Sequence, residues 1–355
     1  MNRLLCSVFL LLIILPAASD ASEVSKVRLD KKEFSPSAGG KVTVSFESGS
    51  TSEAFVIIYD RLGREIRHIK SDKVDQGGFK ALWNGKYSDG KQPEGNVFLY
   101  TIETATEDGK KAVYNPASST GGSRMETLEY TFDKEKGLIE YILPKTSMVR
   151  IRTGLSSGMF AGTIFDWQPK TAGRHSLYWD GKDGSGLMNI ANHPQLELNL
   201  SSYSLPANTI IFKGNIVPFK EDAEMVSTEE NPWFVKDKYL HYSHDPRDCH
   251  DPSFRFSFPG SEKNENRVPV IFGRTPLRVI LNEADTNYMI NSRFEVMVFM
   301  DGIFLFEVEE GTSPFTCHLD TKGVKAGEHI ITVNIMSYDD HVGSVSRKII
   351  TGAGS

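Results

Sequence analysis

The sequence Phe79-Lys-Ala-Leu-Trp-Asn-Gly-Lys86 has a close counterpart later in the chain, His175-Ser-Leu-Tyr-Trp-Asp-Gly-Lys182. In each, a short strand-like run ends at a tryptophan and passes into a turn of Asn or Asp followed by Gly. Trp83 and Trp179 are 179 − 83 = 96 residues apart, which is one β-sandwich domain in length. This internal repeat predicts two sandwiches of the same design.

The residues around the first tryptophan have the pattern of short strands separated by tight turns. Residues 41–46 alternate apolar and polar side chains, and residues 55–59 are mostly β-branched or aromatic. The turn Asp60-Arg-Leu-Gly63 follows, and residues 96–102 form the predicted closing strand. Gly beside Asp or Asn favours tight turns because these residues tolerate a positive φ.

The same kind of pattern continues to the end of the chain and predicts an all-β protein of tandem immunoglobulin-like β-sandwiches. Further strands are predicted over residues 138–142, 148–152, 195–200, 277–281, 294–299, 303–308 and 330–335. Asp301-Gly302 has the composition of a two-residue hairpin turn. We assign residues 23–112 to the first sandwich, 124–213 to the second, 214–250 to an irregular acidic connector and 251–355 to the third.

Four sequence features of the first unit resemble the immunoglobulin-like repeat of the flagellar hook-capping protein, a kind of repeat also appended to many secreted bacterial proteins. They are Val56-Ile-Ile-Tyr-Asp-Arg-Leu-Gly-Arg64, the Trp83-Asn-Gly step, the Asp89-Gly90 turn and Pro93-Glu-Gly-Asn-Val-Phe-Leu-Tyr100. The resemblance covers about residues 33–105. It implies that the motif residues build the sandwich and do not catalyse a reaction, and it does not imply a flagellar role.

The resemblance is weaker over about residues 126–204. Trp179-Asp-Gly-Lys-Asp-Gly184 remains there, but Arg152-Thr-Gly154 replaces the Tyr-Asp-x-x-Gly turn of the first unit. We interpret Asp180-Gly-Lys-Asp-Gly-Ser-Gly186 as a hairpin turn rather than a calcium loop, because the loop lacks the ligand spacing of an EF-hand.

The first 22 residues have the layout of a secretory signal peptide, with Arg3 at the start, an apolar run from Leu4 to Leu15 and small residues at the exit. The run is too short for a membrane-spanning helix, which needs about 20 residues. We therefore expect an exported protein that is periplasmic, on the cell surface or extracellular. No membrane span is expected after signal removal, and a retained N-terminal anchor is the alternative.

The composition and the known catalytic motifs argue against two classes of function. The 40 basic and 46 acidic residues are well mixed, and no basic stripe with interleaved aromatics suggests a nucleic-acid partner. No zinc-protease motif or phosphate-binding loop occurs in the sequence. We expect a protein that is not an enzyme and has no cofactor, with His175 and His329 on solvated faces of strands.

The connector holds the densest cluster of metal-ligating residue types, within residues 241–251. His241, His244, Cys249 and His250 are candidate ligands for Zn²⁺ or another transition metal. The alternative is a disulfide between Cys249 and Cys317, because exported thiols usually oxidise. The two interpretations compete for the same sulfur atom.

Four tryptophans provide the remaining leads for binding. Trp83 and Trp179 repeat at the same place in each unit, which favours core packing. Trp167 and Trp233 lie in loop-like sequence and are candidate ligand contacts, able to stack on a sugar or to anchor a protein partner. Packing beneath a loop is the alternative for both.

These observations favour a noncatalytic exported scaffold or adhesion-type protein that binds a protein partner in a periplasmic or cell-surface assembly. Exposed edge strands offer such a partner a place to add a strand of its own. Two alternatives are a carbohydrate-binding module that uses the loop tryptophans, and a metal-binding protein that uses the cluster in the connector.

Overall fold

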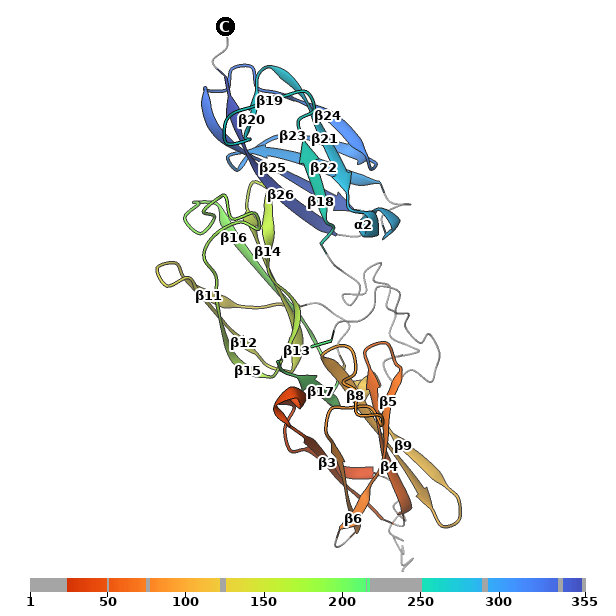
Figure 1. Cartoon of the computed structure of the whole chain (residues 1–355). Helices are drawn as coiled ribbons and strands as arrows, with labels where there is room; N and C mark the ends of the chain where they lie inside the picture. Colours follow the sequence, from red (N-terminus) through yellow and green to blue (C-terminus); the bar gives the residue numbers. More distant parts are fainter. Residues whose placement is uncertain are drawn as a thin grey trace, which may run out of the picture. The chain divides into compact units, whose positions relative to one another are not determined.

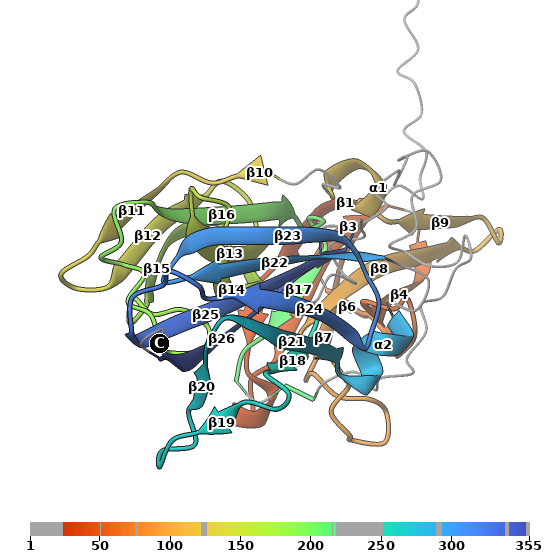
Figure 2. The same ribbon diagram turned by 90° about the horizontal axis from the view of Figure 1, so that it is seen from above.

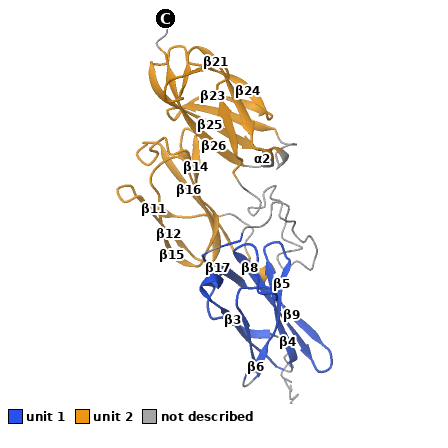
Figure 3. Ribbon diagram, viewed as in Figure 1, with its two compact units in different colours: residues 1–116, 208–234 blue, residues 117–207, 235–355 orange. Residues whose placement is uncertain are grey.

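The computed structural model describes residues 24–49, 51–74, 77–121, 126–214, 216–217, 251–288, 293–337 and 341–352 (Figure 1). The described residues are almost entirely β-structure and form three immunoglobulin-like β-sandwiches in tandem, which confirms the predicted fold class. The chain divides into two compact units (Figure 3). Residues 1–116 and 208–234 make unit 1, which holds the first sandwich, and residues 117–207 and 235–355 make unit 2, which holds the second and third.

The first sandwich packs an antiparallel sheet against a second sheet that is antiparallel except for one parallel pair, around one core. Its elements are β1 (Val24–Leu29), β2 (Glu33–Phe34), η1 (Pro36–Ala38), β3 (Val42–Ser48), β4 (Thr51–Asp60), β5 (Glu65–Lys70), β6 (Asp72–Val74), β7 (Gly78–Trp83), β8 (Val97–Thr106), β9 (Lys111–Tyr114) and β17 (Thr209–Phe212). One sheet has the order β1-β3-β7-β6 among the described residues. The other has the order β2-β17-β8-β4-β5, and β9 also pairs with β8. In β3 the burial alternates residue by residue, as expected for a strand with one face on a core.

Strand β17 completes the first sandwich, although it follows the second sandwich in the sequence. Ile211 and Phe212 pair with β2 in parallel, and residues 209–211 pair with β8 in antiparallel register. The ring of Phe212 lies 5.2 Å from that of Trp83 and 4.3 Å from that of Phe98. The assignment of residues up to 213 to the second sandwich is therefore corrected. Residues 117–207 are an insertion between β9 and β17 of the first sandwich.

The second sandwich repeats the topology of the first. Its elements are α1 (Ala117–Thr120), β10 (Glu126–Thr127), β11 (Tyr130–Asp133), β12 (Leu138–Leu143), β13 (Ser147–Leu155), β14 (Phe160–Lys170), β15 (Gly173–Tyr178) and β16 (Leu196–Ser204). Its sheets have the orders β10-β16-β13-β14 and β11-β12-β15 among the described residues. Strands β12 to β16 thus occupy the places of β3, β4, β5, β7 and β8.

The two tryptophans of the repeat make the same local structure, which explains the conserved spacing within the chain. The indole Nε1 of Trp83 donates to the Lys86 carbonyl at 3.1 Å, and that of Trp179 donates to the Lys182 carbonyl at 3.0 Å. The Gly in each turn, Gly85 or Gly181, has φ of 76° or 80°, a conformation that favours glycine. The prediction that both tryptophans are core residues is confirmed.

The loop from Asp180 to Gly186 contains the predicted hairpin turn, because Lys182 forms an antiparallel bridge with Asn189 and the Gly186 N–H donates to the Asp183 carbonyl at 2.9 Å. It leads from β15 in one sheet toward β16 in the other. Its carboxylates stabilise the turn through backbone contacts: Asp180 accepts from the Lys182 N–H, and Asp183 accepts from the N–H groups of Leu187 and Met188.

The third sandwich has its own core and a larger second sheet (Figure 2). Its elements are β18 (Phe254–Ser257), β19 (Glu262–Lys263), β20 (Pro269–Ile271), β21 (Arg274–Leu281), α2 (Glu283–Tyr288), β22 (Phe294–Met300), β23 (Ile303–Gly311), β24 (Phe315–Asp320), β25 (Gly327–Ser337) and β26 (Val342–Thr351). The sheets have the orders β18-β21-β24 and β19-β20-β26-β25-β22-β23 among the described residues. The predicted hairpin turn at Asp301-Gly302 joins β22 to β23, and both residues have a positive φ.

Within unit 2, the second and third sandwiches pack directly against each other. Phe299 of β22 is fully buried and belongs to the core cluster of the second sandwich. The carboxylate of Asp251, just before the third sandwich, bonds to Arg152 and Thr163 of the second. These contacts join the two sandwiches through both apolar packing and a partly buried ion pair.

Among the described residues, no helix has the length and apolar character that crossing a membrane requires.

Candidate functional site

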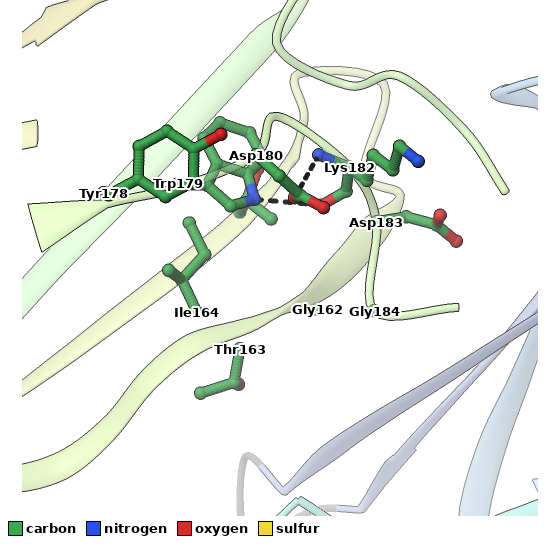
Figure 4. Close-up of a pocket in the computed structure, with 10 residues that line it drawn as sticks. Gly162, Thr163, Ile164, Tyr178, Trp179, Asp180, Lys182, Asp183 and Gly184 are labelled. Carbon is green, nitrogen blue, oxygen red and sulfur yellow. Dashed lines mark hydrogen bonds between the residues drawn. The ribbon is translucent and has the colours of Figure 1, made fainter. Parts of the chain in front are cut away.

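A groove of about 360 Å³ lies on the side of the second sandwich where β14 of one sheet faces the end of β15 in the other (Figure 4). Both strands are at the end of their sheets among the described residues. The lining residues come from β13, β14, the end of β15 and the loop that follows it: Thr153, Gly162, Thr163, Ile164, Tyr178, Trp179, Asp180, Lys182, Asp183 and Gly184. This volume lies near the lower end of the range of about 300–1,000 Å³ that small-ligand pockets occupy.

Tyr178 is the exposed aromatic side chain of this groove. Its side chain is 70% exposed, whereas the neighbouring Trp179 is buried, because successive residues of a strand point to opposite faces. The bond from Trp179 to the Lys182 carbonyl and the bond from the Lys182 N–H to Asp180 fix the turn beside it (Figure 4). The groove therefore has a rigid floor and an aromatic rim.

The backbone of β15 presents hydrogen-bonding groups to the same side. Residues 173–178 pair with β12 in unbroken antiparallel register, and the Trp179 N–H bonds to the Gly137 carbonyl at 2.8 Å. Narrow and wide pairs alternate along an antiparallel ladder. The N–H and C=O groups of Arg174, Ser176 and Tyr178 therefore point away from β12, toward the edge where no described strand pairs.

The first sandwich shows what fits at this edge. There β6 pairs with β7, placing Val74 opposite Gly78 and Asp72 opposite Lys80. Since the repeat offset is 96 residues, the corresponding positions of β15 are 78 + 96 = 174 and 80 + 96 = 176. No strand among the described residues takes the place of β6 in the second sandwich. The edge at Arg174 and Ser176 is thus open where its counterpart is paired.

A second groove, of about 290 Å³, lies between β5 and the end of β7 in the first sandwich. Leu82, which corresponds to Tyr178, is 54% exposed on its wall. Its lining holds three cationic side chains, Lys41, Arg67 and Lys70, beside His68. Lys70 is paired with Glu53 at 2.7 Å, and this contact lowers the pKa of that carboxyl. Exposed apolar side chains before the tryptophan are therefore common to both repeats.

Trp167 does not lie in a loop, so that prediction is corrected. It lies within β14 and is only 8% exposed. The guanidinium of Arg150 lies 4.6 Å from its ring centre, and the ring of Tyr203 lies 5.2 Å away. Because its side chain is buried, Trp167 is a packing residue and cannot serve as an exposed platform for a ligand.

Several other predicted site residues lie outside the described residues. They are Trp233 and the whole candidate metal cluster, His241, His244, Cys249 and His250. Among the residues that the structure does describe, no group of three or more His, Cys, Asp or Glu side chains could hold a metal ion. The metal site and the disulfide from Cys249 both stay predictions.

Cys317 lies in β24 and packs against the core of the third sandwich. Its side chain is half-buried, and this burial raises the pKa of the thiol above its ordinary value. The sulfur lies 3.8 Å from the Leu277 carbonyl. A thiol of raised pKa is a weak nucleophile, so this cysteine is poorly suited to catalysis.

His175 and His329 lie in β15 and β25, which confirms their predicted strand positions. His175 stacks on Tyr141, with 5.4 Å between the ring centres. His329 bonds through Nδ1 to Asp301 at 2.6 Å and through Nε2 to the Lys325 carbonyl at 2.8 Å. The Asp301 carboxylate raises the pKa of His329, because it stabilises the imidazolium form.

Sequence reasoning missed Tyr178 because it considered only tryptophans as exposed aromatics. A signal was present: in each repeat the residue before the buried tryptophan is a large apolar one, Leu82 or Tyr178. A strand that buries the tryptophan must expose this neighbour.

Comparisons with known proteins leave the chain without an assigned family. No protein-family model matches it, and no curated protein matches it. Solved structures resemble it only distantly. One comes from a study of the host cell surface retention of a 1.5-MDa bacterial ice-binding adhesin. It is 10% identical to this chain, has a TM-score of 0.20 and covers 93% of this chain and 98% of that one.

Two further structures are similar at the same level. One is the tetra-tandem repeat in the extending region of a large adhesion protein, at 11% identity and a TM-score of 0.21, covering 94% of this chain and 75% of that one. The other is the catalytic module of the glycogen-degrading pneumococcal virulence factor SpuA, at 14% identity and a TM-score of 0.21, where the match covers 32% of this chain. The chain spans 14% of the length of that module. Similarity this low assigns no function.

Proposed function

We propose that the protein is a noncatalytic scaffold of adhesion type in an extracytoplasmic assembly, and that it binds an extended segment of a protein partner along β15. The observation that carries this proposal is the open edge of β15 beside the Tyr178 groove. In the first sandwich the same edge is paired with β6. Strand addition is a common mode of peptide recognition, because main-chain hydrogen bonds supply affinity and side-chain pockets supply specificity.

The side chains of β15 define the chemistry of the partner segment. An antiparallel partner begins opposite Tyr178 and ends opposite Arg174. A β-branched or aromatic residue suits the first position, since such cross-strand pairs stabilise sheets. An acidic residue suits the last position because it neutralises the exposed guanidinium of Arg174. The preferred order is therefore apolar first and acidic last.

The ionisable groups of the groove support binding rather than catalysis. Asp180 and Asp183 both accept backbone N–H groups of their own loop. A carboxylate used in this way holds a turn and is poorly placed to transfer a proton to a substrate. An extracytoplasmic location is supported by the signal-peptide pattern of residues 1–22.

A glycan partner is the second candidate, favoured by the exposed ring of Tyr178 beside the polar side chains of Asp180 and Lys182. Aromatic rings in shallow grooves stack against the apolar faces of sugars. The two candidates differ in what they need: strand addition needs the backbone of β15, whereas sugar stacking needs only the Tyr178 ring.

The test uses the peptide Tyr-Val-Thr-Val-Glu and its reversed-order control Glu-Val-Thr-Val-Tyr, which has the same composition. Ser176→Pro removes an outward N–H without removing a bond to β12, and Ser176→Ala is its matched control. Binding is measured by fluorescence anisotropy. We expect Ser176→Pro to weaken binding of the first peptide about tenfold and Ser176→Ala to leave it unchanged. If Ser176→Pro binds the first peptide as tightly as the wild type does, the proposal is contradicted. Retention of an oligosaccharide that is lost in Tyr178→Ala and kept in Ser176→Pro favours the glycan.

A further inference from the structure

The outer strand of the third sandwich, β23, carries an unusual run of exposed apolar side chains. Ile303, Phe304 and Leu305 are 69%, 44% and 37% exposed. The strand pairs with β22 on one side, and no described strand pairs with its other side (Figure 2). Natural proteins usually protect a sheet edge with charges, because an apolar edge invites another strand to pair. This edge is unprotected over its first half.

The apolar run is continuous with an interface that the chain already makes. The ring of Phe304 lies edge-on to that of Phe299, with 5.7 Å between the centres. Phe299 is fully buried against the second sandwich, and the preceding Gly302 accepts a hydrogen bond from Ser157 of that sandwich. The start of β23 is therefore held in place by both sandwiches of unit 2. A preorganised surface of this kind loses little conformational entropy when a partner binds.

The second half of β23 is acidic. Glu307, Glu309 and Glu310 are all exposed. Glu310 is paired with Arg293 at 2.5 Å, but both side chains are mostly exposed, so the pair is weak. The edge thus presents an apolar half followed by a half with net negative charge.

This charge pattern disfavours a second copy of the chain as the occupant. Full antiparallel pairing of two β23 strands places Ile303 opposite Glu310 and Phe304 opposite Glu309. Parallel pairing brings the glutamates of the two copies together, and like charges across strands destabilise a sheet. A partner with basic residues opposite the glutamates and apolar residues opposite the apolar half fits both parts.

We propose that the β23 edge binds, by antiparallel strand addition, an extended segment of a protein partner in which basic residues precede apolar ones. This surface is separate from the β15 edge and takes a segment of opposite charge, so the inference does not depend on the proposed function. The chain then has two strand-addition sites of different specificity, one in the second sandwich and one in the third.

The test uses the peptide Lys-Thr-Lys-Thr-Val-Thr-Val and its charge-reversed control Glu-Thr-Glu-Thr-Val-Thr-Val with the full exported chain. The informative variants are Ile303→Lys and the double variant Glu307→Lys with Glu309→Lys. Val113→Lys is the matched control, since Val113 is an exposed valine of β9 in the first sandwich. Ser176→Pro separates this site from the β15 edge.

We expect each β23 variant to weaken binding of the basic peptide about tenfold, with Val113→Lys and Ser176→Pro unchanged. Raising the salt concentration should weaken the binding further, because the glutamates are exposed. Equal binding of the acidic peptide, or no effect of the β23 variants, overturns the proposal. So does a dimer of the unliganded protein that Ile303→Lys converts to a monomer, because the occupant would then be a second copy.

Discussion

The side-chain amide of Asn334 forms two hydrogen bonds with the backbone of Phe160. Its Oδ1 accepts from the Phe160 N–H and its Nδ2 donates to the Phe160 carbonyl, both at 2.8 Å. Asn334 belongs to β25 of the third sandwich and is fully buried, whereas Phe160 begins the edge strand β14 of the second. One amide therefore occupies the place of a neighbouring strand, and it joins the two sandwiches of unit 2.

Asn334→Ala should destabilise unit 2, because it leaves both partly buried backbone groups of Phe160 without that partner. The expected loss is about 2–3 kcal/mol in the free energy of unfolding, measured by denaturant titration. Asn199→Ala, at an exposed asparagine of β16, is the matched control and should change stability by less than about 0.5 kcal/mol. Equal effects of the two variants would show that the amide does not couple the sandwiches.

Phe212→Ala should destabilise the first sandwich and spare the second, because the ring of Phe212 packs on Phe98 and Trp83. Removing a buried phenylalanine costs about 3–5 kcal/mol. Hydrogen exchange followed by mass spectrometry can locate the effect, with lost protection expected over residues 42–106. Lost protection over residues 138–204 instead would mean that β17 belongs to the second sandwich after all.

Gly181→Ala should destabilise the second sandwich more than Gly186→Ala does. Both glycines have a positive φ, so both substitutions strain the backbone by about 1 kcal/mol. A Cβ on Gly181 would also lie 2.7 Å from that of Ala191, whereas a Cβ on Gly186 meets no atom within 4 Å. The overlap should add about 1–3 kcal/mol. Matching thermal-unfolding shifts for the two variants would contradict this account.

The bond between His329 and Asp301 should make stability depend on pH. Both ring nitrogens face oxygen acceptors, Asp301 Oδ2 and the Lys325 carbonyl, so the imidazolium form fits best. The folded-state pKa of His329 is raised above its ordinary value of 6.5. The contribution of this bond to the free energy of unfolding is therefore fully present below the ordinary pKa of 6.5, and it is lost as the pH rises through the raised pKa of His329.

The comparison of wild type with His329→Gln measures this contribution. The difference in unfolding free energy should be largest near about pH 5 and should vanish above the raised pKa. A difference that stays constant across this range would assign the bond no role in the pH dependence.

The fold class followed from the sequence because strand alternation and turn residues are local signals. The repeat of Trp83 and Trp179 gave the spacing of two sandwiches, and the structure shows the same tryptophan-to-carbonyl bond in each. Local signals could not place β17, since Thr209–Phe212 is an apolar run that suits either sandwich. Its assignment depends on pairing with β8, a contact across more than a hundred residues of chain.

The site was harder to predict for a related reason. Trp167 was assigned to a loop because Asp166 precedes it and Pro169 follows, yet both lie within β14, whose pairing with β13 is irregular. The open edge of β15 is visible only by comparison with β6, because an unpaired strand has the same sequence pattern as a paired one. Tyr178 had a usable signal, its place before a buried tryptophan.

The most direct test of the central claim is amide hydrogen exchange along β15, measured by NMR with and without the peptide Tyr-Val-Thr-Val-Glu. Strand addition predicts that the peptide slows exchange at Arg174, Ser176 and Tyr178, whose N–H groups point to the open edge. Exchange at His175 and Leu177, which face β12, should stay unchanged. Unchanged exchange at Arg174, Ser176 and Tyr178 at saturating peptide would contradict the claim that this edge is the docking site.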